Sequence, residues 1–161
     1  MLWCDSQSRS LAIGWSLVIL SLGRVDAAQT NTGKHDPIVR RALALLPAQP
    51  RKVLVVDASR ALRRSDADGR KVQAFVLVGE DVVYLIAQGD ALLRARNEGP
   101  GMFDYVVATL IWHEMAHIAG ADEREAQRRE EELWRRFLMA RRINSGPGLR
   151  YLQLLGKRAA R

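Results

Sequence analysis

A short run of the sequence, His113-Glu114-Met115-Ala116-His117, combines two histidines with a glutamate. Residues four apart lie on the same face of an α-helix, so the imidazoles of His113 and His117 can bind one zinc ion. Glu114 lies between them along the chain, where its carboxylate can act on a zinc-activated water as a general base without being a ligand itself. The pattern predicts a zinc-dependent hydrolase with one zinc ion per chain.

A third protein ligand is expected, because a catalytic zinc ion usually takes three and leaves one position open. No histidine follows His117, and the single cysteine, Cys4, lies in an N-terminal segment that we expect to be removed. Cysteine-ligated zinc and thiol catalysis are therefore excluded for the mature chain. The nearest acidic residues downstream are Asp122, Glu123 and Glu125.

Two resemblances to known zinc peptidases favour one of these three residues. The spacing of His113, His117, Gly120 and Glu123 resembles the metzincin signature, in which a glycine turn brings a third ligand, usually His or Asp, back to the metal. The run from Glu123 to Ala126 resembles the Glu-x-x-Ala element of gluzincins, whose glutamate is the third ligand. Both resemblances imply a zincin-type zinc metallopeptidase with Glu123 as third ligand, and they cover little more than residues 105–130.

Capping chemistry agrees with this choice. Gly120 can supply the left-handed residue that ends a helix, and Asp122 can cap the next one with Glu125 as its reciprocal partner. Glu123 would then be free to point at the metal. Glu125 is kept as the alternative third ligand.

Hydrophobic periodicity and breaker residues predict the elements that must position these groups. Two strands are separated by Gly79-Glu80-Asp81, which has the length and chemistry of a hairpin turn. Residues 63–70 are strongly polar and are expected to form an exposed loop. The predicted helices are 37–46, 90–97, 102–119, 123–143 and 149–160, and the predicted strands are 53–56, 72–78 and 82–87.

The predicted fold class is α+β, with helices packed on one face of a small antiparallel sheet. The β-hairpin should lie beside the active-site helix, which two further helices follow. A strand at the edge of the sheet could hold an extended peptide by backbone pairing. Residues 35–161 are expected to form a single zincin-like catalytic domain.

The N-terminal segment has the layout of a signal peptide. Arg9 precedes an apolar run, residues 11–22, and small residues at Val25 and Ala27 suit cleavage after Ala27 or Ala28. We therefore expect residues 1–27 to be a signal peptide and 28–34 a flexible lead-in. The protein would be exported, periplasmic or secreted, with no membrane span after cleavage; an uncleaved N-terminal membrane anchor is the alternative.

The chain is basic, with 25 Lys and Arg against 18 Asp and Glu, a formal net charge of +7. Such a surface can attract nucleic acid, anionic lipid or acidic peptides. The mixed Arg and Glu residues of 124–142 are, however, typical of a solvated helix with internal ion pairs, and no aromatic base-stacking motif is present. The expected partner is a peptide or protein substrate rather than nucleic acid.

Two other functions use the same residues. An exported basic binding protein could carry a structural or degenerate zinc site, although a structural site normally has four protein ligands and three good donors are visible. A zinc amidase could instead cleave amide bonds of the cell wall.

Overall fold

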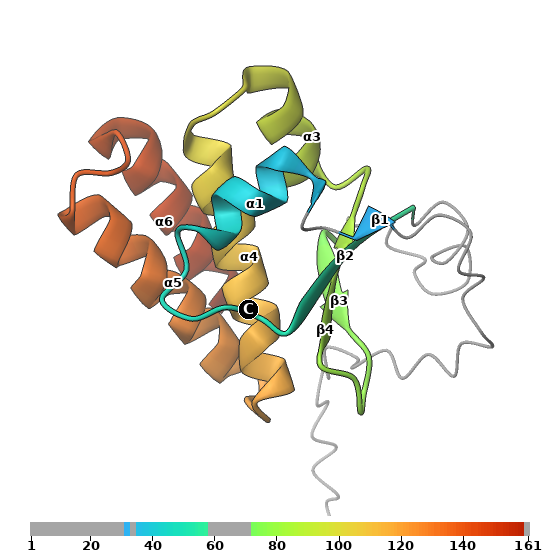
Figure 1. Cartoon of the computed structure of the whole chain (residues 1–161). Helices are drawn as coiled ribbons and strands as arrows, with labels where there is room; N and C mark the ends of the chain where they lie inside the picture. Colours follow the sequence, from blue (N-terminus) through green and yellow to red (C-terminus); the bar gives the residue numbers. More distant parts are fainter. Residues whose placement is uncertain (1–30, 33–34, 58–71, 160–161) are drawn as a thin grey trace, which may run out of the picture.

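A computed structural model describes residues 31–32, 35–57 and 72–159 (Figure 1). The predicted signal peptide and the predicted loop at 63–70 lie outside the described residues. Helices gather on one side of a small sheet, as Figure 1 shows. The predicted α+β class is therefore confirmed.

The described strands form one sheet in the order β1-β2-β4-β3. The predicted hairpin is confirmed, because β3 and β4 pair antiparallel. The prediction of a wholly antiparallel sheet is wrong, because β2 and β4 run parallel. Because a long connection separates β2 from β3 in the sequence, the hairpin can pair with β2 through its second strand, β4. The strands are β1 (Asn31–Thr32), β2 (Lys52–Val56), β3 (Ala74–Val76) and β4 (Val82–Ile86).

Strand β1 falls within the segment 28–34, which was expected to be flexible. Asn31 pairs with Val55 and Thr32 with Leu54, in antiparallel register. This short pairing adds a strand at one side of β2, while β3 is the outermost strand on the other side. The polar composition of the segment gave no sign of it, because two residues are too few to show an alternating pattern.

One face of the sheet packs against the helices. Val53 and Val55 of β2, and Val83 and Leu85 of β4, belong to the same buried cluster as the apolar side chains of the helices. These residues are two apart on each strand, as expected for side chains that share one face. These apolar residues of β2 and β4 therefore build the sheet side of the core.

The helices surround α4, which is the centre of the domain. Helix α4 contacts α1, α3 and α5, and it also lies against β3 and β4, so the hairpin is beside it as predicted. Most of its circumference is apolar, with Val106, Val107 and Ile111 buried, which suits a helix covered on several sides. The helices are α1 (Pro37–Leu43), α3 (Asp90–Glu98), α4 (Met102–Ile118), α5 (Glu123–Met139) and α6 (Ser145–Ala159).

Helix α6 begins at Ser145, four residues before its predicted start at Leu149. The two glycines and the proline at 146–148 predict a break, but here they form the first turn of the helix. Oδ1 of Asn144 accepts a hydrogen bond from the backbone N–H of Gly146 at 3.1 Å. Pro147 falls in the first turn, where its missing N–H costs no helical hydrogen bond. A Cβ on Gly148 would lie 2.5 Å from Cδ2 of Leu138, so this glycine allows α6 to pack closely on α5.

Helix α5 ends at Met139, four residues before the predicted end at Ile143. Arg141 follows with a positive φ of 54°, and its N–H donates to the carbonyl of Leu138. The chain therefore turns before Ile143, whose side chain is buried in the core. Among the described helices, none is long and apolar enough to cross a membrane.

Candidate metal centre

Three side chains that the sequence predicts as ligands meet at one point. Nε2 of His117 lies 3.2 Å from Nε2 of His113 and 3.2 Å from Oε2 of Glu123. Nε2 of His113 lies 3.6 Å from the same carboxylate oxygen. Ligand atoms held about 2.0–2.1 Å from a tetrahedral zinc ion lie about 3.4 Å from one another. The spacing of these donors therefore fits a single small metal ion.

The turn after α4 brings the third donor back toward the two histidines. Gly120 has a φ of 85°, and its N–H donates to the carbonyl of His117 at 2.9 Å. The N–H of Ala121 donates to the carbonyl of Ala116, also at 2.9 Å, which completes a Schellman turn. Only a residue that tolerates positive φ can hold this geometry without strain, so Gly120 has the predicted role.

The same turn also orients one of the imidazoles. The carbonyl oxygen of Ala121 lies 3.0 Å from Nδ1 of His117. A proton on Nδ1 can be donated to this oxygen, which leaves Nε2 with a lone pair directed at His113 and Glu123. Neutral imidazole in this tautomer is the form that binds a metal through Nε2.

Glu123 is the first residue of α5, after Asp122, whose Oδ1 accepts a hydrogen bond from the N–H of Glu125 at 2.8 Å. Nε2 of Gln127 donates to Oε1 of Glu123 at 2.6 Å, so that Oε2 is the oxygen that faces the histidines. Burial acts to raise the pKa of Glu123, but its contacts with His113 and His117 lower that pKa well below its ordinary value. The carboxylate is therefore charged and available as a donor.

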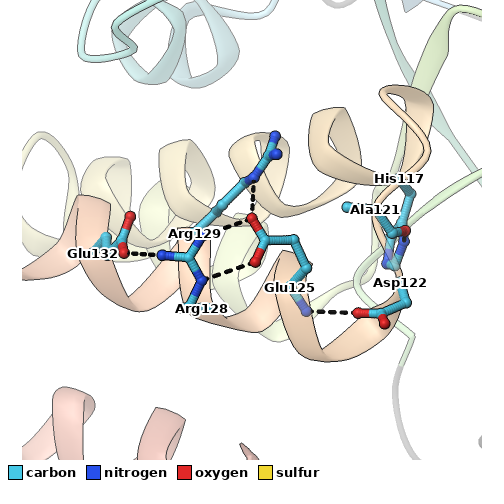
Figure 2. A network of polar contacts seen from close by, with 7 residues as sticks. All are labelled: His117, Ala121, Asp122, Glu125, Arg128, Arg129 and Glu132. Carbon is cyan, nitrogen blue, oxygen red and sulfur yellow. Dashed lines mark hydrogen bonds and ion pairs between the residues drawn. The ribbon is translucent and has the colours of Figure 1, made fainter.

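Glu125, the alternative ligand, is engaged elsewhere, as Figure 2 shows. Its carboxylate oxygens accept hydrogen bonds from Arg128 at 2.7 and 2.8 Å and from Arg129 at 2.9 Å. The predicted cap by Asp122 is confirmed. The Glu125 carboxylate pairs with these arginines instead of returning to the cap as predicted, because two arginines in the next turn offer it stronger, charge-assisted hydrogen bonds. Arg128 also pairs with Glu132.

Glu114, the predicted general base, lies in the same helix as both histidines and is 9% exposed. Burial raises the pKa of Glu114 to about 7, while the neighbouring histidines act to lower it. A carboxylate with a pKa near neutrality is well matched to accept and return a proton at physiological pH. Its position and its environment both suit the predicted role.

Without a metal ion, the surrounding carboxylates favour protons on the imidazoles. Burial acts to lower the pKa of His113, but Glu123 and Glu130 outweigh it and raise this pKa to about 10. The contact with Glu123 likewise raises the pKa of His117. The site thus concentrates negative charge around two imidazoles, an arrangement that also attracts a divalent cation.

A further functional candidate, Glu130, was missed in the sequence. It is 3% exposed, and its Oε2 lies 3.2 Å from Nδ1 of His113. This nitrogen is buried and forms no hydrogen bond with any described residue, so its contact with Glu130 is a close charge contact that lacks the angle of a hydrogen bond. The available signal was that Glu130 falls on the apolar face of α5, between Ala126 and Leu133.

Residues that flank the motif serve the core. Ile111 and Val107 are buried, and the ring of Tyr105 packs edge-on against Phe137. Thr109, one turn before His113, is fully buried, and its hydroxyl donates to the carbonyl of Val106 at 3.0 Å. Its hydrogen bond is therefore internal to the helix.

The chain matches no protein-family model, no curated protein and no solved structure. The resemblance to zincins therefore stays a prediction that rests on the motif residues. The geometry adds one independent fact. Within the described residues, His113, His117 and Glu123 are brought together as a group that could hold a metal ion.

Proposed function

We propose that this protein is a zinc-dependent hydrolase, and that it is a metallopeptidase. The observation that carries the proposal is the convergence of His113, His117 and Glu123, with donor atoms 3.2 to 3.6 Å apart, beside the buried carboxylate of Glu114. Two imidazoles and one glutamate are a donor set found at catalytic zinc sites. A bound zinc ion would supply Lewis acidity, which polarises a carbonyl group and lowers the pKa of water.

The number of donors favours a catalytic site over a structural one. Structural zinc sites are usually closed by four protein ligands, whereas three ligands leave room for water or substrate. The cluster among the described residues contains three such donors. Glu123 is half-exposed, so the site is accessible from solvent on that side.

Glu114 supplies the proton transfers. Its carboxylate accepts a proton from the attacking water, and the resulting carboxylic acid donates that proton to the amine that leaves when the amide bond breaks. A pKa of about 7 allows one group to act in both directions. This role needs no second acid at the site.

A peptide substrate is supported by the position of β3. This strand is at the end of the order β1-β2-β4-β3, and it contacts α4, the helix that carries both histidines. An outermost strand offers backbone N–H and C=O groups to an extended chain. A peptide added at β3 would run beside α4. We also propose export, on the signal-peptide layout of residues 1–27.

The test is cleavage of a peptide library by the purified protein, measured with and without a zinc chelator and after zinc is restored. We expect cleavage that the chelator abolishes and zinc restores. A parallel assay on cell-wall cross-link amides separates a peptidase from an amidase. Stoichiometric zinc without hydrolysis of either substrate class would contradict the proposal and favour a binding protein.

A further inference from the structure

Glu130 is a buried carboxylate in the interface between α4 and α5. Its side chain is 4% exposed and lies on the same helical face as Ala126, Leu133 and Trp134, which are all buried. A carboxylate in such surroundings is unfavourable unless it is paired with a cation or with hydrogen-bond donors. The partners of Glu130 should therefore reveal its role.

The two oxygens of Glu130 face two other helices. Oε2 lies 3.2 Å from Nδ1 of His113 on α4. Oε1 accepts a hydrogen bond from the hydroxyl of Tyr151 on α6 at 3.4 Å. The ring of Tyr151 also packs against Trp134, with ring centres 4.3 Å apart. One oxygen of the Glu130 carboxylate is thus bound by Tyr151 of α6, while the other faces His113.

The two ring nitrogens of His113 face different groups. Nε2 faces His117 and Glu123, and Nδ1 faces Glu130. An imidazole that binds a metal through Nε2 carries its proton on Nδ1, and this proton needs an acceptor. Nδ1 is buried and has no hydrogen bond within the part of the chain that the structure describes, and Oε2 of Glu130 at 3.2 Å is placed to accept this proton after a small rotation of either side chain.

We propose that Glu130 is a positioning residue that fixes the tautomer and the orientation of His113 for metal binding. Tyr151 in turn orients Glu130, so α6 supports the metal centre. This inference rests on the proposed function. The two histidines are then oriented by different acceptors. The backbone carbonyl of Ala121 orients His117, and the carboxylate of Glu130 orients His113.

The test compares the zinc affinity of E130Q with that of the unaltered protein, by competition with a chromophoric chelator and without substrate. Glutamine keeps the shape of the side chain but replaces the charged acceptor of the Nδ1 proton with the weaker, neutral acceptor of an amide oxygen. We expect zinc affinity to fall about 10- to 100-fold. The matched control is E132Q on the same helix, whose partner is the exposed Arg128; its affinity should be unchanged.

A second readout separates positioning from plain structural support. In the zinc-loaded protein, the Nδ1 proton of His113 should give a low-field imidazole signal in the proton–nitrogen NMR spectrum, and E130Q should move it upfield. Y151F, which keeps the carboxylate but removes one hydrogen bond, should lower zinc affinity about two- to tenfold. Far-UV circular dichroism and the melting temperature establish that each variant is folded.

The outcomes distinguish the two proposals. Zinc binding with equal affinities for E130Q and the unaltered protein would overturn the role of Glu130 and leave the proposed function intact. Absence of zinc binding in the unaltered protein would contradict the proposed function itself. If E130Q fails to fold, the unaltered protein and Y151F decide: no low-field Nδ1 proton, or unchanged zinc affinity in Y151F, would overturn the inference.

Discussion

The carbonyl oxygen of Ala121 lies 3.0 Å from Nδ1 of His117. Ala121 belongs to the turn that reverses the chain after α4, and two residues later Glu123 begins α5. One short turn therefore orients a histidine and returns a carboxylate to it. Its geometry depends on Gly120, whose φ is 85°.

Replacement of Gly120 by alanine should weaken both the fold and zinc binding. A Cβ there meets nothing within 4 Å, so the penalty is backbone strain rather than a clash. We expect a loss of about 1–2 kcal/mol in the free energy of unfolding. Zinc affinity should also fall, because relief of the strain moves Ala121 and Glu123. Chemical denaturation and zinc titration measure the two effects.

Gly79 provides the matched control. It has the same φ of 85° and equal open space, but it lies in the hairpin turn. Gly79→Ala should cost similar stability and leave zinc affinity unchanged. If both variants bound zinc like the unaltered protein, the turn after α4 would not position the ligands.

Glu123→Ala should weaken zinc binding strongly, because it removes one of three donors. Glu125→Ala should leave zinc affinity nearly unchanged, because its carboxylate pairs with Arg128 and Arg129. Parallel zinc titrations of the two variants compare them directly. A greater loss in Glu125→Ala would transfer the third ligand to that residue.

Zinc binding should release protons. The pKa of His113 is raised to about 10, so this imidazole favours the protonated form at neutral pH, and the contact with Glu123 raises the pKa of His117 as well. Zinc needs both imidazoles neutral, and its affinity should therefore rise with pH through the neutral range and fall as the medium becomes acidic. Calorimetric titration in two buffers of different ionisation enthalpy counts the protons. An affinity independent of pH would contradict the histidine ligands.

The cluster of His113, His117 and Glu123 could be predicted from the sequence because the arrangement of these residues is local. His113 and His117 share a helix, and Glu123 follows after one turn, so spacing and capping rules are sufficient to bring them together. The cap by Asp122 follows from the same rules. The reciprocal contact expected of Glu125 was wrong, because capping rules do not weigh the competing arginines that follow it.

Glu130 could not be predicted in this way, because its role depends on how three helices pack. Its distance from His113 follows from the contact between α4 and α5, and its contact with Tyr151 follows from the position of α6. The surrounding Arg and Glu residues also made α5 look like a solvated helix. A glutamate in the apolar stripe of an amphipathic helix was the overlooked signal.

The order of the strands was also beyond local rules. The turn at Gly79 predicts that β3 and β4 pair, but not which of them joins β2. Similarly, the sequence predicts that Gly148 interrupts a helix, but this residue lies within α6. Its carbonyl accepts a hydrogen bond from Nε1 of Trp134 on α5 at 2.8 Å. Both features are decided by packing between distant segments.

We expect cleavage of the signal peptide to leave a mature N-terminus at Ala28 or Gln29, because small residues follow the apolar run. Intact-mass measurement of protein recovered outside the cytoplasm determines the cleavage position. Recovery of the full-length chain in the membrane fraction would instead support the N-terminal anchor.

The central claim is that Glu114 acts as a general base beside a metal that it does not bind. The most direct measurement is the rate of peptide cleavage by Glu114→Gln, taken together with its zinc content. The account predicts one zinc ion per chain, an unchanged fold and a rate lower by about two orders of magnitude or more. Loss of zinc from this variant, or cleavage at the rate of the unaltered protein, would contradict it.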